Sequence, residues 1–433
     1  MREAMARLAP RRAFVPGRDE ESRGPDGRIA ALCAVAVYAT AVAVAEVVGR
    51  VDLWRAFGVH SAPTLFYDAR NVAAAADCWA LGFDPLVENP CDPAGRVMNY
   101  PRVWLLLHFI GVTQDRTLLF GGVVVVLFLI SVMLLVGRLS IGQGAVLAVA
   151  LISPAVMLAV ERANMDLFLF VLFVGAVLAW RARTRISSLL GPGLIVVAAI
   201  AKLYAIFALP AYAFTGKRQT RWVIPVGAAA MTVYLALTLT DFRQVLRAPE
   251  GGLLYSYGAR ILIGYLYHSV APGPWLHGSL LAQLIAIVPL MLLSVAVWRW
   301  ARARVDPLLP AEQASWRTLA FHLGALTYIG TFLTRKSGDY RLVFLLLTLP
   351  LLFEWVRGDP RAPRTVTSRV AIVTVVAGLW VGALSPFIGP WDELASWGVA
   401  LVLTALLAAT VPQRPLFVRT DRRDVHAVVG VPH

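Results

Sequence analysis

The sequence predicts an all-α protein that crosses a membrane several times, and three observations lead to this fold class. Hydrophobic residues make up 58% of the 433 residues, and the mean hydropathy is +0.68. Charged residues make up only 15%, whereas a soluble domain carries about 25%. Apolar stretches long enough to span a bilayer recur between residues 30 and 410. We therefore expect one helical membrane domain over residues 29–411.

The two ends of the chain differ from this domain. Residues 1–28 are polar and rich in arginine, and residues 412–433 are again polar. The first apolar run, Ile29 to Val48, is too long for the hydrophobic part of a signal peptide and lacks a convincing cleavage site. We expect a permanent first helix between a flexible basic N-terminal tail and a C-terminal tail, both cytoplasmic.

Apolar runs predict about twelve transmembrane or partly spanning helices. Several are shorter than the roughly 20 residues of a full span. Their predicted ranges are 29–49, 117–137, 143–160, 165–181, 189–201, 203–215, 222–240, 279–299, 318–334, 341–356, 369–388 and 392–411.

The distribution of charge sets the predicted topology. With the N-terminus inside and alternating crossings, most Lys and Arg residues fall in inside segments, as the positive-inside rule requires. The scheme requires residues 189–215 to form two segments, so we expect a short hairpin that turns at Lys202. Topology accounts for most of the net charge of +14, which makes nucleic acid an improbable partner.

Two long loops, 50–116 and 241–278, fall outside. The first has Pro, Gly and Asp turns and two short helical patterns, near 68–81 and 102–112. It contains Cys78 and Cys91, for which a disulfide and free thiols are both open alternatives, and their spacing argues against zinc. The second loop is apolar, and its tyrosines suit either a membrane interface or sugar stacking. These are Tyr255, Tyr257, Tyr265 and Tyr267.

Ionisable side chains at membrane depth mark candidate functional positions, because they are costly there unless they face a partner or a cavity. Three groups occur: Glu161, Arg162, Asn164 and Asp166 in "ERANMD"; Lys202 in "AIAKLYAIF"; and Arg335, Lys336, Asp339 and Arg341 in "TRKSGDYR". The topology opens all three to the exterior side. For Arg335 and Lys336, simple snorkelling to the interface is an equal alternative.

Six stretches in order resemble a known family. They are "LFYDAR", "GFDPL", "NYPRVW", "ERANMD", "AKLYAIFALP" and "GDYRLVFLLLTLP". Over residues 29–356 the chain is similar to membrane glycosyltransferases of the GT-C superfamily. The nearest group is family 87, which includes polyprenol-phosphate-mannose-dependent α-mannosyltransferases of actinobacteria. Two departures are Ala163, where such relatives often carry Gly, and Ala205, where Pro would be typical.

The resemblance implies transfer of a sugar, mannose by default, from a polyprenyl-phosphate donor to a lipid or glycan acceptor on the exterior face of the plasma membrane. Asp68 fits the carboxylate base that takes the acceptor proton, with inversion at the sugar. Asp77 and Asp166 are alternative bases, and an N-cap is the structural alternative for Asp68. Asp84 and Asp92, each before a proline, fit turns better.

The leaving phosphate requires cations, for which Arg162, Lys202 and Arg341 are the candidates. The other residues expected to bind or orient the donor are Arg70, Glu161, Asn164, Asp166, Asp339 and Tyr340. This chemistry requires no cofactor or metal, although some GT-C relatives use a divalent cation, which leaves a metal open.

Two other functions remain in competition. Broken polar helices are also how transporters and flippases build their sites, but no internal repeat of the polar motifs is visible. A structural scaffold would leave Lys202 and "ERANMD" without a purpose. The sequence contains no Walker loop, no strand-associated G-x-G-x-x-G and no H-E-x-x-H.

Overall fold

The computed structural model describes residues 25–48, 53–182, 184–215, 222–247, 255–259, 261, 280–304, 312, 314–334, 336–358 and 363–412. This part of the chain is mostly helical, which confirms the all-α class. It contains one short antiparallel pair of strands, β1 (Ser256–Tyr257) and β2 (Ser337–Gly338), with Ser256 opposite Gly338.

The helices, with 3-10 helices marked η, occur in the following order. They are α2 (Gly27–Val48), α3 (Leu53–Ala56), α4 (Tyr67–Ala80), η3 (Arg102–Ile110), η4 (Gln114–Arg116), α5 (Thr117–Val136), α6 (Ile141–Leu151), α7 (Pro154–Glu161), α8 (Met165–Ala182), α9 (Arg185–Ala201), η5 (Leu203–Thr215), α10 (Val223–Leu237), α11 (Leu239–Arg247), α13 (Leu280–Arg304), α15 (Trp316–Thr334), η8 (Asp339–Thr348), α16 (Leu349–Val356), α17 (Pro363–Val381), η9 (Gly382–Leu384), α18 (Ser385–Ile388), η10 (Gly389–Asp392) and α19 (Glu393–Thr410).

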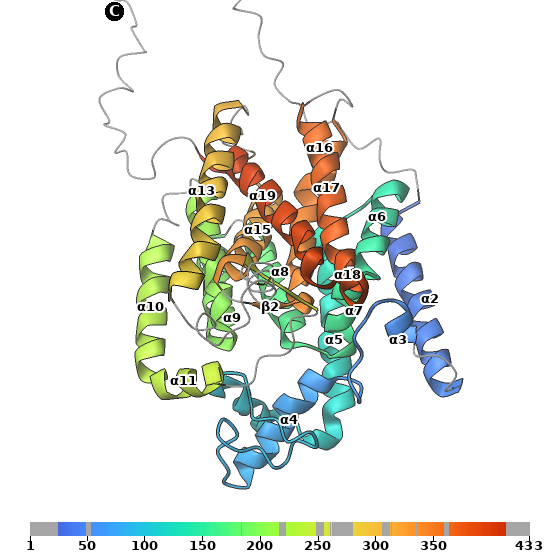
Figure 1. Ribbon diagram of the computed structural model, residues 1–433, viewed down its shortest axis with the longest axis vertical. Coiled ribbons are helices and arrows are strands. Elements are labelled where there is room, and N and C mark those ends of the chain that lie inside the picture. Colours follow the sequence, from blue (N-terminus) through green and yellow to red (C-terminus); the bar gives the residue numbers. More distant parts are fainter. Residues whose placement is uncertain are drawn as a thin grey trace, which may run out of the picture.

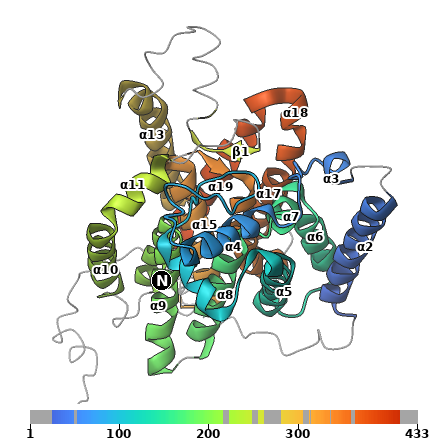
Figure 2. The same cartoon turned by 90° about the horizontal axis from the view of Figure 1, so that it is seen from below.

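The long helices form a bundle, and α4 lies at one end of it while α16 lies at the other (Figure 1). Seen from below, α4 crosses the end of the bundle, and α2 and α10 lie at opposite edges (Figure 2). The predicted helical patterns near 68–81 and 102–112 correspond to α4 and to the 3-10 helix η3.

Five helices in the described residues are long and apolar enough to cross a membrane, or up to seven if each bent pair is one span. The chain is thus a multi-pass membrane protein by helix length and composition, but the predicted count of about twelve is not confirmed. Two predicted segments contain sharp bends: α6 and α7 within 143–160 meet at 56°, and α10 turns by 82° into α11. Two other predicted segments are helices shorter than a full span, Leu189–Ala201 and Leu203–Thr215.

Local sequence explains these breaks. Ser153 caps α7 by accepting a hydrogen bond from Val156 N, and Pro154 occupies the first turn, where a proline is tolerated. The expected break at Lys202 is confirmed, because this residue is extended (φ −151°, ψ 115°) and separates α9 from η5. The two helices pack against each other.

The core lies where α8, α15, η5 and η8 contact one another. In α8, 61% of the spanning window is buried, compared with 22% in α2. Helix α2 therefore exposes most of its surface. It is fixed at its start, where Gly27 and Gly144 of α6 approach so closely that a Cβ on Gly144 would lie 2.1 Å from the Gly27 carbonyl oxygen.

Candidate functional site

The site is organised by the elbow between α7 and α8, which is the "ERANMD" segment. Helix α7 ends in a Schellman motif, because Ala163 N donates to Val160 O (2.9 Å) and Asn164 N donates to Ala159 O (2.9 Å). Ala163 takes the left-handed position of that motif, with φ 42°. Glycine is the usual residue at this position, so the departure at Ala163 introduces backbone strain.

Helix α4 begins directly on this elbow. Phe66 N donates to Glu161 O (2.8 Å), and Asp68 N and Ala69 N donate to Arg162 O (3.1 and 3.3 Å). The free carbonyls at the end of α7 thus satisfy free N–H groups at the start of α4. Phe66 precedes the helix in a left-handed conformation (φ 59°), and its ring packs on Gly121 of α5.

The elbow and its neighbours form a connected cluster that we call the polar network: Asp68, Asn164, Asp166, Lys202 and Arg341. Asn164 is its centre, since its Nδ2 donates to Asp68 Oδ2 (2.6 Å) and its Oδ1 accepts from Lys202 Nζ (3.0 Å). Lys202 also pairs with Asp166. The same Asn164 Oδ1 accepts from Asp166 N (2.9 Å), which closes the turn into α8.

Arg341 joins the network from η8. Its Nε lies 3.6 Å from Asp166 Oδ2, and its Nη1 donates to Ser337 Oγ (2.9 Å). Its guanidinium lies 4.6 Å from the centre of the Tyr204 ring. Because Asp166 is fully buried, its charge needs both Lys202 and Arg341 as partners.

Asp68 is not a helix cap. The N-cap of α4 is Phe66, and Asp68 lies in the first turn, where a carboxylate is favoured by the helix dipole. Its side chain is 15% exposed, and its second oxygen lies 3.9 Å from Arg96 Nη1. One oxygen is thus fixed by Asn164, and the other lies near a cation.

Arg96 is a residue that sequence analysis missed. It donates to Tyr67 O (2.9 Å), pairs with Asp92 (2.8 Å) and stacks 3.5 Å from the centre of the Tyr67 ring. It therefore holds the start of α4. Only its position before "NYPRVW" could have suggested a role, because these contacts depend on the path of the loop.

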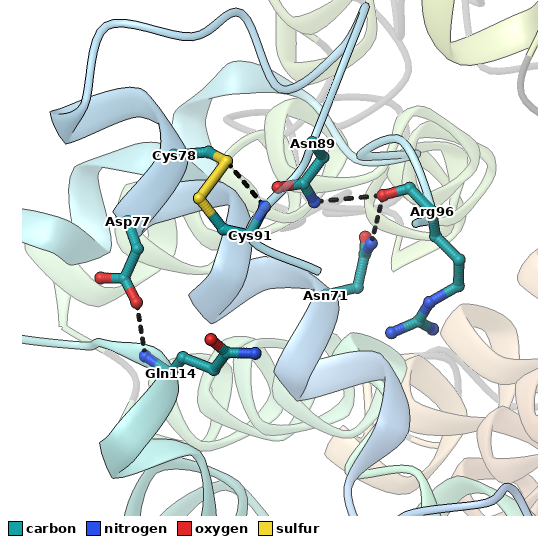
Figure 3. Close-up of a disulfide and its surroundings, with 7 residues drawn as sticks. All are labelled: Asn71, Asp77, Cys78, Asn89, Cys91, Arg96 and Gln114. Atoms are coloured by element: carbon teal, nitrogen blue, oxygen red, sulfur yellow. Dashed lines mark hydrogen bonds between the residues drawn. A yellow bond between two sulfur atoms is a disulfide. The ribbon is translucent and has the colours of Figure 1, made fainter. Parts of the chain in front are cut away.

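A disulfide between Cys78 and Cys91 sets that path, which decides between the two alternatives left open by the sequence. It joins α4 to the loop that continues to Arg96 (Figure 3). The Arg96 carbonyl accepts from the side chains of Asn71 (3.3 Å) and Asn89 (3.1 Å), so the backbone is fixed there as well.

Several predicted site residues lie near the network without joining it. Glu161 accepts from Ala62 N (2.9 Å) and lies 4.0 Å from Arg162 Nε, while Tyr340 places its ring 5.7 Å from Lys202 Nζ. Arg70 is half-buried on α4, and its Nε makes no hydrogen bond in the described structure. Asp339 turns away, and its carboxylate packs on Gly382.

Other acidic residues of the first loop have structural roles. Asp77 accepts from Gln114 N (2.8 Å). Asp84 and Asp92 accept from the N–H groups two residues on, at Leu86 (3.1 Å) and Ala94 (2.8 Å), as predicted for turn residues. Burial alone would raise the pKa of Asp84, but the hydrogen bonds from Arg102 and Leu86 N, together with the charge of Arg102, outweigh burial and lower the pKa.

The aromatic residues of the second loop divide between core and site. Tyr257 is buried and stacks on Tyr328 with ring centres 5.4 Å apart, so it belongs to the core. Tyr255 stacks on His60 at 4.8 Å. Partial burial lowers the pKa of His60, and the charge of Arg162 lowers it further. Tyr265, Tyr267 and Arg335 lie outside the described residues.

A cavity of about 630 Å³ adjoins the polar network. Lys202 and Arg341 contribute to its lining, and most of the remainder is apolar, from α9, η5, α10 and α11. Asp68 and Arg162 do not line it. The predicted cations thus divide, with two facing this cavity and Arg162 beside Glu161.

Among the described residues, no group of three or more His, Cys, Asp or Glu side chains is arranged to hold a metal ion. The site therefore consists of two carboxylates, an amide and two cations at the border of an apolar cavity. Comparisons with protein-family models, with curated proteins and with solved structures found no match to this chain.

Proposed function

We propose that this protein transfers a sugar, mannose by default, from a polyprenyl-phosphate donor to a lipid or glycan acceptor on the exterior face of the membrane. The observation that carries the proposal is the polar network beside the apolar cavity. It joins a carboxylate, Asp68, through one amide to a cation, Lys202, that lines the cavity.

The cavity suits the donor. A polyprenyl phosphate needs an apolar channel for its chain and fixed cations for its single phosphate. Lys202 and Arg341 supply two cations at a mainly apolar wall. Asp166 lies between them and holds both in place, at 3.6 Å from Arg341 Nε.

In the proposed reaction, each of these residues has a defined role. Asp68 removes the proton from an acceptor hydroxyl, and that oxygen forms a bond to the anomeric carbon of the sugar. The bond from this carbon to the phosphate oxygen breaks, and the phosphate leaves with the electron pair. Lys202 and Arg341 stabilise the negative charge that develops there. Attack opposite the leaving group inverts the configuration.

Asn164 sets the geometry between the two groups. It binds Asp68 at 2.6 Å and Lys202 at 3.0 Å, so it fixes the proposed base relative to the cation at the cavity. Asp68 is outside the cavity lining and partly exposed, which suits a base that meets the acceptor rather than the donor.

The test uses the full chain reconstituted in vesicles with polyprenyl-phosphate mannose and a panel of lipid and glycan acceptors. We expect Asp68→Asn to lower turnover by about 10²–10⁴-fold, because a positioned base contributes that much. Asp77→Asn is the matched control on the same helix. Its carboxylate accepts from Gln114 N, a bond that asparagine can keep, so its turnover should stay near wild type.

Unchanged transfer by Asp68→Asn would remove Asp68 as the base. A second candidate function, a transporter or flippase, is favoured by the bend between α6 and α7 and the break at Lys202. Movement of labelled polyprenyl-phosphate mannose across the vesicle bilayer, without transfer to any acceptor, would support that function instead.

A further inference from the structure

A second cavity lies at the end of the bundle opposite α4. Its volume is about 170 Å³, and it is formed where α5 and α8 end, where α15 begins and where α16 ends. Figure 1 shows α16 and α4 at these opposite ends. The described lining contains four arginines and one carboxylate, which we call the arginine pocket: Arg138, Arg181, Arg317, Arg357 and Glu354.

Two of these arginines share an aromatic ring. The guanidinium of Arg317 lies 4.8 Å from the centre of the Trp316 ring, and that of Arg181 lies 5.5 Å from it. Arg317 also donates to Glu354 Oε1 (3.1 Å). Stacking on a rigid ring orients a guanidinium in advance, so less entropy is lost when it binds a ligand.

A third arginine, Arg357, is held by a side chain of α6 and by a backbone carbonyl of the pocket. Arg357 donates to Gln143 Oε1 (2.9 Å) and to Arg138 O (3.3 Å). Gln143 is buried and donates in turn to Phe353 O (3.0 Å). The arginines therefore converge on one cavity through interactions with α6, α16 and the turn after α5.

Cations outnumber carboxylates at the arginine pocket among the described residues, since four arginines and Glu354 line it and one further carboxylate, Asp26, lies 4.0 Å from Arg138 Nε. The positive-inside rule explains why arginines occur on one side of a membrane protein. It does not explain why four of them line a single cavity. The pair Arg364–Glu312 (3.2 Å) shows the balanced arrangement elsewhere in the chain, again with a tryptophan, Trp355, 5.9 Å from the guanidinium.

The chemistry of the excess cations selects the ligand. Planar guanidinium groups bind phosphate oxygens through paired hydrogen bonds, and basic pockets between membrane helices suit lipid head groups. The pocket also has apolar lining residues, Val136, Leu139 and Phe353, that could contact acyl carbons. We infer that the arginine pocket binds a phosphate group, either that of an anionic membrane lipid or free phosphate. This inference does not depend on the proposed transferase activity.

The test uses the full chain purified in micelles of a non-ionic maltoside detergent, which contains no phosphate. In one arm phosphatidylglycerol is titrated and bound lipid is counted by native mass spectrometry. In the other arm inorganic phosphate is titrated, and the shift in melting temperature is followed. We expect saturable binding in at least one arm, and the tighter arm identifies the source of the phosphate. Arg317→Gln should weaken this binding about tenfold, because it removes a charge-assisted hydrogen bond.

Two further variants make the test decisive. Arg364→Gln is the matched control, since it removes an arginine that also has a glutamate and a tryptophan beside it but lies outside the pocket lining. It should bind like wild type. Glu354→Gln should tighten binding, because it removes the one carboxylate in the pocket lining. Equal weakening by Arg317→Gln and Arg364→Gln, no gain in Glu354→Gln, or no binding in either arm would overturn the inference.

Discussion

The polar network and the arginine pocket are two charged clusters at opposite ends of one bundle, and they handle charge differently. In the network, Asp166 is fully buried and both neighbouring cations contact it. In the pocket, Arg317 and Glu354 are 34% and 38% exposed, and cations are in excess. Buried charge requires a partner within the protein, whereas exposed charge can be balanced by a ligand. The first cluster is built to hold a geometry, and the second to attract an anion.

Asp166→Asn should produce the largest loss of stability, because it leaves two cations beside a neutral side chain. We expect a loss of about 3–5 kcal/mol, typical of breaking a buried ion pair. Chemical denaturation in detergent would measure it. Adding Lys202→Met to the same chain should recover part of the loss. A cost below about 1 kcal/mol would mean that the network is not under the electrostatic constraint described.

Replacing both Cys78 and Cys91 by serine should have the next largest effect. Closure of a loop with a sequence separation of 13 residues contributes about 3 kcal/mol through the entropy of the unfolded chain. Melting of wild type with and without reductant should show the same difference. If reductant changed the melting temperature of the double variant as well, the effect could not be assigned to this disulfide.

Ala163→Gly should act in the opposite direction. Ala163 has φ 42°, and glycine removes a left-handed strain of roughly 1–2 kcal/mol while adding flexibility to the unfolded chain. The expected net gain is up to about 1 kcal/mol. Ala159→Gly, inside the regular part of α7, is the control and should destabilise. A loss of stability in both variants would contradict the role of Ala163 in the Schellman motif.

The smallest effect belongs to Asp26, near the arginine pocket. The hydrogen bond from Arg28 lowers its pKa to about 2 from 3.8, so the folded state binds the proton less readily than the unfolded state. Its contribution is complete above pH 3.8 and is lost as the pH falls through about 2. We expect at most about 1 kcal/mol, since the ion pair with Arg28 is partly exposed. Melting of wild type and Asp26→Asn should therefore converge at low pH.

Most of the polar network could be predicted because its members interrupt apolar runs. Lys202 stands alone among hydrophobic residues, and Asp166 lies in the short polar segment "ERANMD" between two apolar runs; only a shared partner or a cavity justifies the cost of such charges. The break at Lys202 follows from the charge distribution, because the alternation of inside and outside segments requires residues 189–215 to be two segments. The number of full spans could not be predicted in this way, because the bends after α6 and α10 depend on how the helices pack.

Residues whose roles depend on three-dimensional paths could not be assigned from the sequence. Asp339 was grouped with Arg341, but they lie on a 3-10 helix, where successive side chains point about 120° apart. Arg341 therefore faces Asp166 while Asp339 faces Gly382. Arg96 reaches α4 only because its loop is fixed at the disulfide. In the sequence, the arginines of the arginine pocket occur at separate positions and indicate only membrane topology.

The backbone hydrogen bonds between the end of α7 and the start of α4 have a consequence for how this chain can change. Phe66, Asp68 and Ala69 donate to carbonyls of the "ERANMD" segment almost a hundred residues away. The start of α4 and residues 161–166 can therefore be exchanged between proteins only together. A chimera that takes the first long loop from another protein must also take residues 161–166, or it will separate the carboxylate from the amide that holds it.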